Sequence, residues 1–334
     1  MKEFSHFSLK DFNTFGLDVY ASRFIEYNSA EDVIAICKTL QTPYIIIGRG
    51  SNLLFTSDFK GTVLHCSNQD IVPSSIQADP STVLLEVGAG TIWDNLVEWS
   101  IKHGLSGIEN LSLIPGEVGS AAVQNIGAYG VEAKDFIEWV EFVRIDTGEI
   151  CQEDASHLHY SYRQSIFKNE WADKCAITRV GIRLSKQFLP RLEYGTLQNR
   201  FRSTEPLTPQ IVRNGIIEIR RQKLPDPKVI GNAGSFFMNP IVSKDIFDKI
   251  HSQYPEMPYY EQNEGVKIPA GWLIEQSGWK GKSLGHAGVY EKQALVLVNL
   301  GNATGEDISI LSDTIRKEVF NKFGIHLHPE VRFI

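Results

Sequence analysis

Two glycine-rich segments restrict the fold of this chain more than any other feature of its sequence. The first, Gly48-Arg49-Gly50-Ser51-Asn52, comes directly after the short β-branched run Tyr44–Ile47. The second, Leu113–Gly130, reads LIPGEVGSAAVQNIGAYG and contains four glycines. Glycine permits backbone conformations and close backbone approaches that other residues do not. Both segments therefore suit a fold in which the backbone lies directly against a ligand.

Strands and helices alternate around these segments, which predicts an α+β first half. A helix is expected from an N-cap at Thr91 to His103, where Gly104 closes it. Strands are expected where apolar and β-branched residues are dense, at Tyr44–Ile47, Gly61–Cys66, Thr82–Val87, Phe136–Ile145 and Ala176–Leu184.

A smaller α/β unit is expected after an interdomain linker at Leu224-Pro225-Asp226-Pro227. The amphipathic segment Thr208–Gln222, with Pro209 near its start, predicts the helix before this linker. The expected elements after it are a strand over Ser235–Val242, helices from Ser243, near Ala270–Gln276 and over Thr304–Phe323, and strands at Ala294–Asn299 and His328–Ile334.

Composition excludes several classes of protein. Among 334 residues, 33 Lys and Arg stand against 40 Asp and Glu, a net charge of −7 that argues against nucleic-acid binding. The basic cluster around Arg213, Arg220 and Lys223 leaves two possibilities open, a solvated helix face or an anionic small ligand. No apolar run is long enough to suggest a membrane span. Four cysteines without a CxxC pair, and no signal peptide, favour reduced thiols and a cytoplasmic protein.

The glycine segments indicate a phosphate site, because backbone N–H groups in such turns form anion-binding concavities. Gly48–Asn52 is not a dinucleotide fingerprint of the Rossmann type, since Leu53 stands where the third glycine is required. Together with Pro115–Ser120 it suits the two phosphates of one dinucleotide, with Ser51, Asn52 and Ser120 as neutral donors. Two unrelated structural turns remain the alternative.

Three residues are candidates for chemistry, each with a structural alternative. Ser235 opens an expected apolar strand within GNAGSFFMNP, and no GxSxG elbow is present, so a proton donor is favoured over a hydrolase nucleophile. A serine that satisfies the backbone is the alternative. Glu330 shares one face of the last expected strand with His328 and Arg332, as a solvated edge also would. Arg163 lies in a polar loop, where arginines are usually surface residues.

In chain order, seven segments resemble the UDP-N-acetylenolpyruvoylglucosamine reductase family, type I branch, and the resemblance covers nearly the whole chain. They are Asn13-Thr14-Phe15-Gly16, Gly48–Asn52, IPGEVGSAAVQNIGAYG, SYRQSIFK, GNAGSFFMNP, AGWLIEQ and HPEVRFI. The resemblance implies an α+β fold with a PCMH-type, vanillyl-alcohol-oxidase-like FAD-binding domain in two α+β subdomains, and a smaller α/β substrate-binding domain. The implied ranges are 1–67 joined by a strand at 326–334, 68–208, and 224–325.

The resemblance also implies the reaction, which is NADPH-dependent reduction of UDP-N-acetylglucosamine enolpyruvate to UDP-N-acetylmuramate in peptidoglycan precursor synthesis. FAD is implied as a non-covalent cofactor, NADPH as co-substrate and a monomer as the assembly, with no metal, nucleic-acid or membrane partner. Arg163 resembles the arginine near the flavin and the substrate carboxylate, Ser235 the serine proton donor, and Glu330 the catalytic glutamate.

Further site residues are carried over by position from the family motifs. Those implied to contact the cofactor are Gly48, Gly50, Ser51, Asn52, Pro115, Gly116, Gly119, Ser120, Asn125, Gly127 and Ile177. Those implied to contact the UDP-sugar are Tyr129, Tyr194, Lys223, Asn239 and Gln293. Two positions depart from the pattern: Met238 stands where the family often has lysine, and Gln164 where it often has aspartate.

Two other functions fit part of this pattern. A flavin oxidase of the same superfamily, acting on an alcohol or lactone, often binds FAD covalently through His or Cys, and neither residue occurs in the two glycine segments. A non-catalytic nucleotide-binding module explains the glycines but not the combination of Arg163, Ser235 and Glu330.

Overall fold

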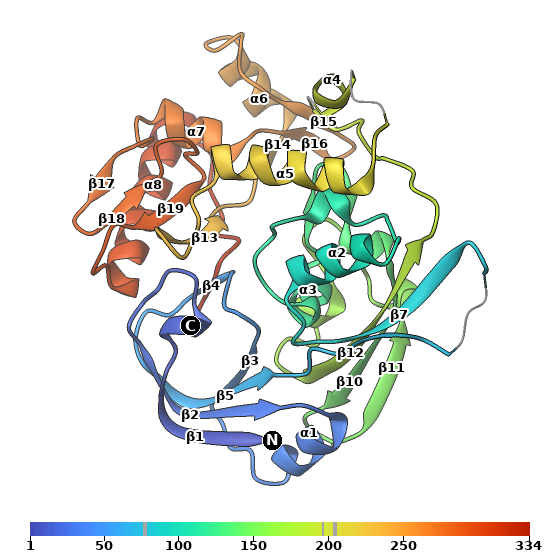
Figure 1. Cartoon of the computed structure of the whole chain (residues 1–334). Helices are drawn as coiled ribbons and strands as arrows, with labels where there is room; N and C mark the ends of the chain where they lie inside the picture. The colour runs from blue at the N-terminus through green and yellow to red at the C-terminus, as the bar shows by residue number, and fades with distance from the viewer. Residues whose placement is uncertain (76–78, 196, 203–205) are drawn as a thin grey trace. The chain divides into compact units, whose positions relative to one another are not determined.

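The computed structural model describes residues 1–75, 79–195, 197–202 and 206–334, and the chain divides into two compact units (Figure 1). Unit 1 consists of Met1–Phe7, Ala21–Arg49 and Lys60–Arg220. Unit 2 consists of Ser8–Tyr20, Gly50–Phe59 and Arg221–Ile334. Each unit therefore joins segments that lie far apart in the sequence.

Unit 1 is built on two sheets. The first has the order β1-β2-β5-β3, with bounds Lys2–Ser8, Tyr20–Tyr27, Phe59–Cys66 and Tyr44–Ile47. Its β3 and β5 run parallel, and Ile47 lies opposite His65. The second has the order β11-β10-β12-β7-β6, with bounds Ile150–Asp154, Ile137–Arg144, Cys175–Ser185, Thr82–Gly88 and Ile71–Pro73. A small hairpin pairs β8 (Gly127–Ala128) with β9 (Val131–Glu132).

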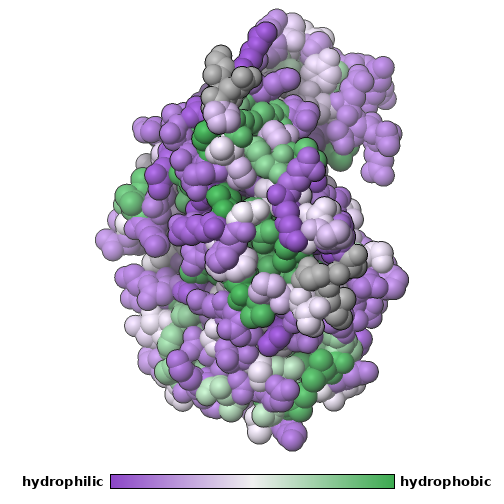
Figure 2. Space-filling view, turned by 45° about the vertical axis from the view of Figure 1, so that its right-hand side comes forward, coloured by the Kyte–Doolittle hydropathy of each residue, from purple (hydrophilic) through white to green (hydrophobic). Residues whose placement is uncertain are grey.

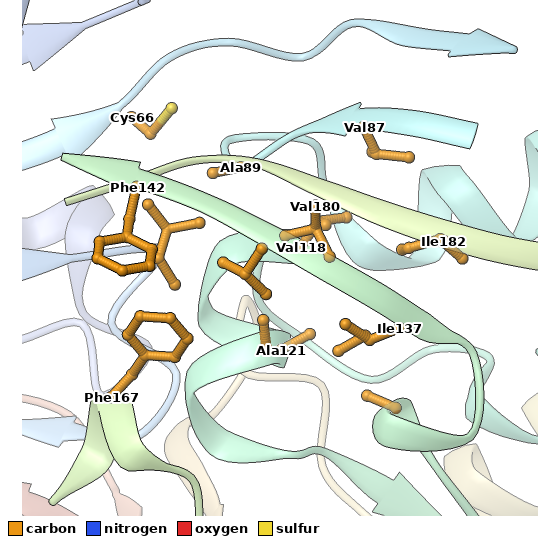
Figure 3. Close-up of a cluster of buried hydrophobic side chains, with 14 of the residues drawn as sticks. Cys66, Val87, Ala89, Val118, Ala121, Ile137, Phe142, Phe167, Val180 and Ile182 are labelled. Carbon is orange, nitrogen blue, oxygen red and sulfur yellow. The ribbon is translucent and has the colours of Figure 1, made fainter. Parts of the chain in front are cut away.

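The core of unit 1 lies between the second sheet and α3 (Val118–Gln124). Val118 and Ala121 of α3 lie among Val180 and Ile182 of β12, as Figure 3 shows. Nearly every residue of β12 is buried, because this central strand is covered on both faces. The other helices of this part are α1 (Ala30–Cys37), α2 (Trp93–Lys102), α4 (Leu197–Phe201) and α5 (Pro209–Lys223).

Unit 2 contains two small antiparallel sheets and a short parallel pair. The first sheet has the order β13 (Gly231–Ser235), β19 (Val296–Asn299), β18 (Ala287–Val289) and β17 (Ser283–Leu284). The second has the order β14 (Ile241–Val242), β16 (Gly265–Lys267) and β15 (Tyr260–Gln262). The parallel pair is β20 (Arg332–Phe333) beside β4 (Leu53–Leu54). Its helices are α6 (Lys244–His251), α7 (Ala270–Gln276) and α8 (Gly305–Phe323). α8 packs on β18, β19 and α7, and a capping box of Thr304 and Asp307 fixes its start. Short 3₁₀ helices over the chain are Lys10–Phe12, Glu109–Leu111, Ala133–Asp135, Ala155–His157 and Ile166–Lys168.

Most expected elements are confirmed, but several bounds differ, and of the strand expected over Ser235–Val242 only Ile241–Val242 forms one beyond Ser235. Ser235 closes β13 instead of opening a strand, because Gly234 takes the left-handed conformation at φ +67° and the register with β19 shifts there. Only Arg332–Phe333 of the expected final strand forms a β-ladder. Phe333 is 39% exposed while Val331 is buried, so these two side chains do not share a buried face.

The surface and the thiols are unexceptional. Figure 2 shows that hydrophilic side chains cover most of the face it draws, with hydrophobic residues in separate groups, as on ordinary protein surfaces. All four cysteines are free, and burial raises the pKa of the Cys66 and Cys175 thiols to about 12. In the described part of the chain, no helix is long and apolar enough to cross a membrane.

The buried amide of Asn13 fixes the segment that carries the first family motif. Its Nδ2 donates to the carbonyls of Leu9 and Leu17 at 2.8 and 3.0 Å, and its Oδ1 accepts from the Leu17 N–H at 2.8 Å. Asn13→Ala leaves the buried Leu17 N–H without its partner and removes one of the two hydrogen bonds that each of the Leu9 and Leu17 carbonyls accepts, so we expect it to lower the free energy of unfolding by about 1–3 kcal/mol. Urea denaturation measures this loss. Asn321→Ala, at an exposed position of α8, serves as the control, and equal stability of the two variants would contradict the assignment.

Candidate active site

The first glycine segment is tightly packed at Gly48 and leaves no room for a side chain at Gly50. In unit 1, a Cβ on Gly48 would come within 3.1 Å of Glu117 Oε2 and Ser120 Oγ. In unit 2, Gly50 has φ +63°, and a Cβ there would come within 2.0 Å of the Phe12 carbonyl oxygen. Gly50 therefore requires glycine, whereas a side chain at Gly48 would have to displace Glu117 or Ser120.

The second glycine segment is anchored inside unit 1 at the start of α3. The N–H groups of Val118 and Gly119 donate to the carbonyls of Thr91 and Ala89 at 2.9 and 2.8 Å. A Cβ on Gly119 would come within 2.9 Å of the Ala89 Cβ, so this glycine permits close packing. The cofactor contacts predicted for Pro115, Gly116, Gly119 and Ser120 stay predictions; Pro115 is exposed, Gly116 and Ser120 are half-buried, and Gly119 is buried.

Two residues near the end of the same segment, Asn125 and Gly127, form hydrogen bonds with the turn that carries Arg163. Asn125 is fully buried in the left-handed conformation at φ 45°, and its Nδ2 donates to Glu132 Oε2 and to the Ser161 carbonyl at 2.8 and 2.9 Å. Arg163 lies in a tight turn that is closed by backbone hydrogen bonds between Ser161 and Gln164, and its own backbone is also left-handed, at φ 58°. Its Nη2 donates to the Gly127 carbonyl at 2.9 Å. Such conformations at non-glycine residues often mark functional sites.

A cluster of cations and tyrosines surrounds Arg163 in unit 1. The Tyr129 side chain hydrogen-bonds Arg220, and its ring meets the Tyr194 ring edge-on at 6.2 Å between centroids. Burial lowers the pKa of the Arg220 guanidinium, the Tyr129 hydroxyl opposes that shift, and the charge of Arg163 adds to it. Burial likewise raises the pKa of Tyr129. This cluster presents positive charge beside aromatic rings, which suits an anionic ligand with a planar part.

Arg220 belongs to the basic cluster for which the sequence left a solvated helix face or an anionic ligand open, and it was not among the predicted site residues. The side chain as a whole is half-buried, but its Nε is fully enclosed and has no hydrogen-bond partner among the residues that the structure describes. Arg213, seven residues earlier on the same face of α5, binds Asp94 of α2 with two hydrogen bonds of 2.6 and 2.9 Å. The seven-residue spacing within the basic cluster was the available signal.

Unit 2 brings Ser235 and Glu330 together. The exposed Ser235 pairs with Val296 at the end of β13, and the next residue, Phe236, accepts the Glu330 N–H at 2.8 Å. Asn52 adds a second tie, because its Nδ2 donates to the Glu330 carbonyl at 3.1 Å. The backbone of the half-buried Glu330 is thus tied to the residue that follows Ser235 and to the side chain of Asn52.

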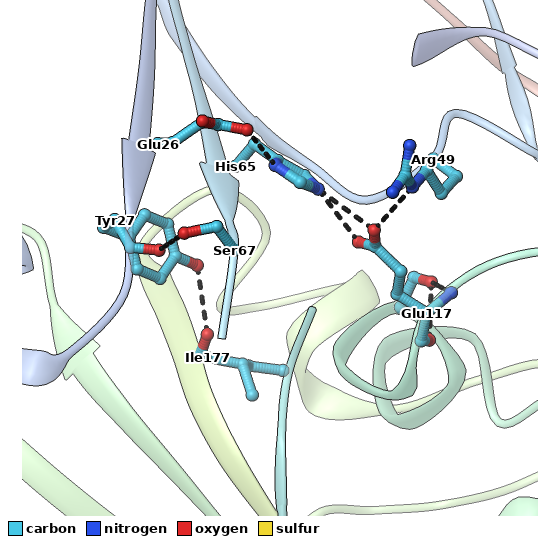
Figure 4. A network of polar contacts seen from close by, with 8 residues as sticks. Glu26, Tyr27, Arg49, His65, Ser67, Glu117 and Ile177 are labelled. Atoms are coloured by element: carbon cyan, nitrogen blue, oxygen red, sulfur yellow. Dashed lines mark hydrogen bonds and ion pairs between the residues drawn. The ribbon is translucent and has the colours of Figure 1, made fainter. Parts of the chain in front are cut away.

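Two predicted substrate residues lie at the start of α7. Asn239 Oδ1 accepts the Ala270 N–H at 2.9 Å, and a Cβ on Gly271 would come within 3.1 Å of Gln293 Oε1. Lys223, at the end of α5, is exposed. Of the predicted cofactor residues, Ile177 is buried and its carbonyl accepts the Tyr27 hydroxyl at 3.0 Å (Figure 4).

Comparisons with known proteins define the class. The description "FAD binding domain" matches residues 21–153, and "UDP-N-acetylenolpyruvoylglucosamine reductase, C-terminal domain" matches residues 225–334. A crystal structure of UDP-N-acetylenolpyruvylglucosamine reductase from Thermus caldophilus has the same fold, with a TM-score of 0.69 at 24% identity over 99% of this chain and 98% of that one. The chain is an FAD-dependent oxidoreductase with a PCMH-type FAD-binding domain.

Curated relatives give the family. The chain is 49% identical over 331 residues to UDP-N-acetylenolpyruvoylglucosamine reductase of Bacteroides fragilis, covering 98% of this chain and 99% of the relative. It is 46% identical over 332 residues to the protein of that name from Shewanella oneidensis, covering 98% and 96%. The chain belongs to the UDP-N-acetylenolpyruvoylglucosamine reductase family, and the resemblance found in its motifs is confirmed.

Proposed function

We propose that this protein reduces UDP-N-acetylglucosamine enolpyruvate to UDP-N-acetylmuramate with NADPH, as a step of peptidoglycan precursor synthesis. The observation that carries the proposal is the backbone bond between Glu330 and Phe236, because it joins the segment of the predicted glutamate to the residue that follows the predicted proton donor, Ser235. Family membership supports the substrate and the co-substrate.

The residues of the two glycine segments fit FAD. Gly48 lies directly against the start of α3, and Gly50 has the conformation of a tight turn, as a diphosphate-binding backbone requires. Neither glycine segment contains His or Cys, which supports non-covalent binding. The residues that would hold the cofactor are the predicted set from Gly48 to Asn52, Pro115 to Ser120, Asn125, Gly127 and Ile177. When bound, FAD supplies the hydride chemistry.

The chain's own residues manage charge and one proton. Arg163 binds the carboxylate of the substrate with its planar guanidinium, which stabilises negative charge as it develops on the neighbouring carbon. The Gly127 carbonyl orients that guanidinium. Ser235 then donates its hydroxyl proton to this carbon, so that a C–H bond forms as the O–H bond breaks. Solvent restores the proton, which the exposure of Ser235 permits.

The proposal extends to organisation and location. Three domains are proposed, which consist of residues 1–67 with 326–334, residues 68–208 and residues 224–325. The parallel pairing of β20 with β4 supports the assignment of the C-terminal strand to the first domain. The free cysteines support a reducing cytoplasm, and a monomer is expected. Through peptidoglycan synthesis the activity contributes to cell shape and division.

The absorbance spectrum of the purified protein tests the proposal. We expect a yellow protein whose visible flavin absorbance disappears on addition of NADPH and returns on anaerobic addition of UDP-N-acetylglucosamine enolpyruvate. Acid precipitation is expected to leave the colour in solution, whereas a covalent flavin oxidase keeps it in the pellet. A colourless protein, or NADPH oxidation that does not depend on the enolpyruvate, would refute the proposal.

A further inference from the structure

We propose that Glu117 positions the two glycine segments for FAD through a buried network with Arg49 and His65. This inference rests on the proposed cofactor site and concerns how the protein keeps the two glycine segments in place before FAD binds. Glu117 is a positioning residue in this scheme, since its carboxylate lies behind both segments and acts through them.

The network is enclosed within unit 1. The Glu117 side chain is 2% exposed and that of His65 is 4% exposed. His65 Nε2 lies 3.0 and 3.2 Å from the two carboxylate oxygens, an arrangement in which the ring nitrogen donates (Figure 4). Glu26 Oε1 lies 3.7 Å from the other ring nitrogen, Nδ1. A buried carboxylate is stable only with such partners, so its place is fixed by the elements that carry them.

Arg49 and Gly48 connect the carboxylate to the first glycine segment. Arg49 Nε donates to Glu117 Oε1 at 2.9 Å across 68 residues of sequence. Glu117 Oε2 lies where a Cβ on Gly48 would be 3.1 Å away. His65 faces Ile47, the residue before Gly48, across the parallel β3–β5 pair. These three contacts therefore fix the position of the end of β3, where the first glycine segment begins.

The same residue starts the second segment. Glu117 is the N-cap of α3 in a capping box, where its side chain accepts from the Ser120 N–H and its own N–H donates to Ser120 Oγ at 3.0 Å. With the bonds of Val118 and Gly119 to the Thr91 and Ala89 carbonyls, this leaves the first turn of α3 in one orientation. One side chain thus links the two segments predicted to hold the diphosphate.

Charge alone argues against a direct contribution of Glu117 to FAD affinity. A carboxylate near a diphosphate repels it, so its removal would strengthen binding if charge were the dominant effect. We infer that its ordering effect dominates, because a preorganised site binds more tightly than one that must be ordered by the ligand. The two effects have opposite signs, which makes them separable by experiment.

The experiment is titration of the apoprotein with FAD, followed by quenching of flavin fluorescence, together with the thermal unfolding temperature of each apoprotein. Glu117→Gln keeps the shape and an acceptor for Arg49, and we expect its dissociation constant to stay within about threefold of the parent value. Glu117→Ala removes both, and we expect binding weaker by about 10- to 100-fold. Arg179→Met, at a surface ion pair of the same unit, is the control and is expected to leave FAD affinity unchanged.

Arg49 variants test the same idea at a side chain that is 36% exposed, and His65 remains as a partner of the Glu117 carboxylate in each of them. We expect Arg49→Met to weaken FAD binding about tenfold, and the Arg49→Met, Glu117→Ala double variant to bind as weakly as Glu117→Ala alone. We expect Arg49→Lys to weaken binding as well, because lysine lacks the Nε donor. The Arg49 pair decides the question if Glu117→Ala does not fold.

Several outcomes would overturn the inference. The first is tighter FAD binding by both Glu117 variants. The second is a parental dissociation constant in Glu117→Ala, Arg49→Met or Arg49→Lys. The third is additive effects of the two substitutions in the double variant. A parent protein that binds no FAD refutes the proposed function instead, so the two failures are distinguishable.

Discussion

Ser235→Ala is expected to abolish turnover while NADPH still reduces the bound flavin at the parental rate. The reason is that hydride delivery from NADPH needs no proton from Ser235, whereas reduction of the enolpyruvate ends in protonation at carbon. A positioned general acid contributes about 10²- to 10⁴-fold, and we expect at least this loss in the step with substrate. Stopped-flow recording of flavin absorbance measures the two half-reactions separately.

Substitution of Ser235 is expected to change the reaction without changing the fold. Ser235 is exposed at the last position of β13, and its neighbours, not its side chain, make the bonds to Leu295 and Glu330. Removing one hydroxyl there disturbs no core contact, so the variant is expected to unfold at the parental temperature. Ser283→Ala, exposed at the start of β17, is the matched control and is expected to keep both half-reactions. Equal losses in the two half-reactions of Ser235→Ala would contradict its role as proton donor.

The elements that the sequence predicted well are those with strong local signals. The β-branched run Tyr44–Ile47 forms β3 within the predicted bounds, and Ala270–Gln276 forms α7 within its own. The helix expected from Thr91 begins at Trp93, because Thr91 instead closes a turn onto Gly88 and Ile92 becomes the N-cap. Boundaries of this kind depend on tertiary contacts, which local propensity does not contain.

The errors and omissions in the site have the same cause. That Ser235 ends a strand depends on the left-handed Gly234 and on pairing with β19, some 60 residues away in the chain. Local pattern gave no indication that Asn125 is a buried structural amide that joins Glu132 to Ser161, although its motif was recognised. Neither the Glu117–Arg49 contact nor the Arg220–Tyr129 contact has a periodicity that a single sequence reveals. Motif order therefore identified the family, whereas the arrangement of supporting residues required the structure.

Arg163→Met is the second variant for which we expect a large loss, again confined to the step with substrate. Removing one preorganised donor at a developing negative charge costs about 10²- to 10³-fold in rate. The Gly127 carbonyl accepts a hydrogen bond from the guanidinium, and in the proposed mechanism this bond orients Arg163 before the substrate binds. Steady-state kinetics with varied enolpyruvate and stopped-flow reoxidation measure this loss, with thermal unfolding as the check on folding.

Arg163→Lys separates charge from geometry at the same position. Lysine keeps the positive charge but binds as a single point and does not reproduce the planar fork of arginine, so we expect it to recover only a minor part of the Arg163→Met loss. Arg220, whose charge lies close enough to Arg163 to affect its own pKa, remains in both variants and limits how much attraction for the carboxylate is lost. The Michaelis constant is therefore expected to rise less than the turnover number falls. Arg191→Met, at a surface pair with Asp135, is the control that should retain full activity. Parental rates in Arg163→Lys would mean that Arg163 acts by charge alone, and parental rates in Arg163→Met would remove it from the reaction.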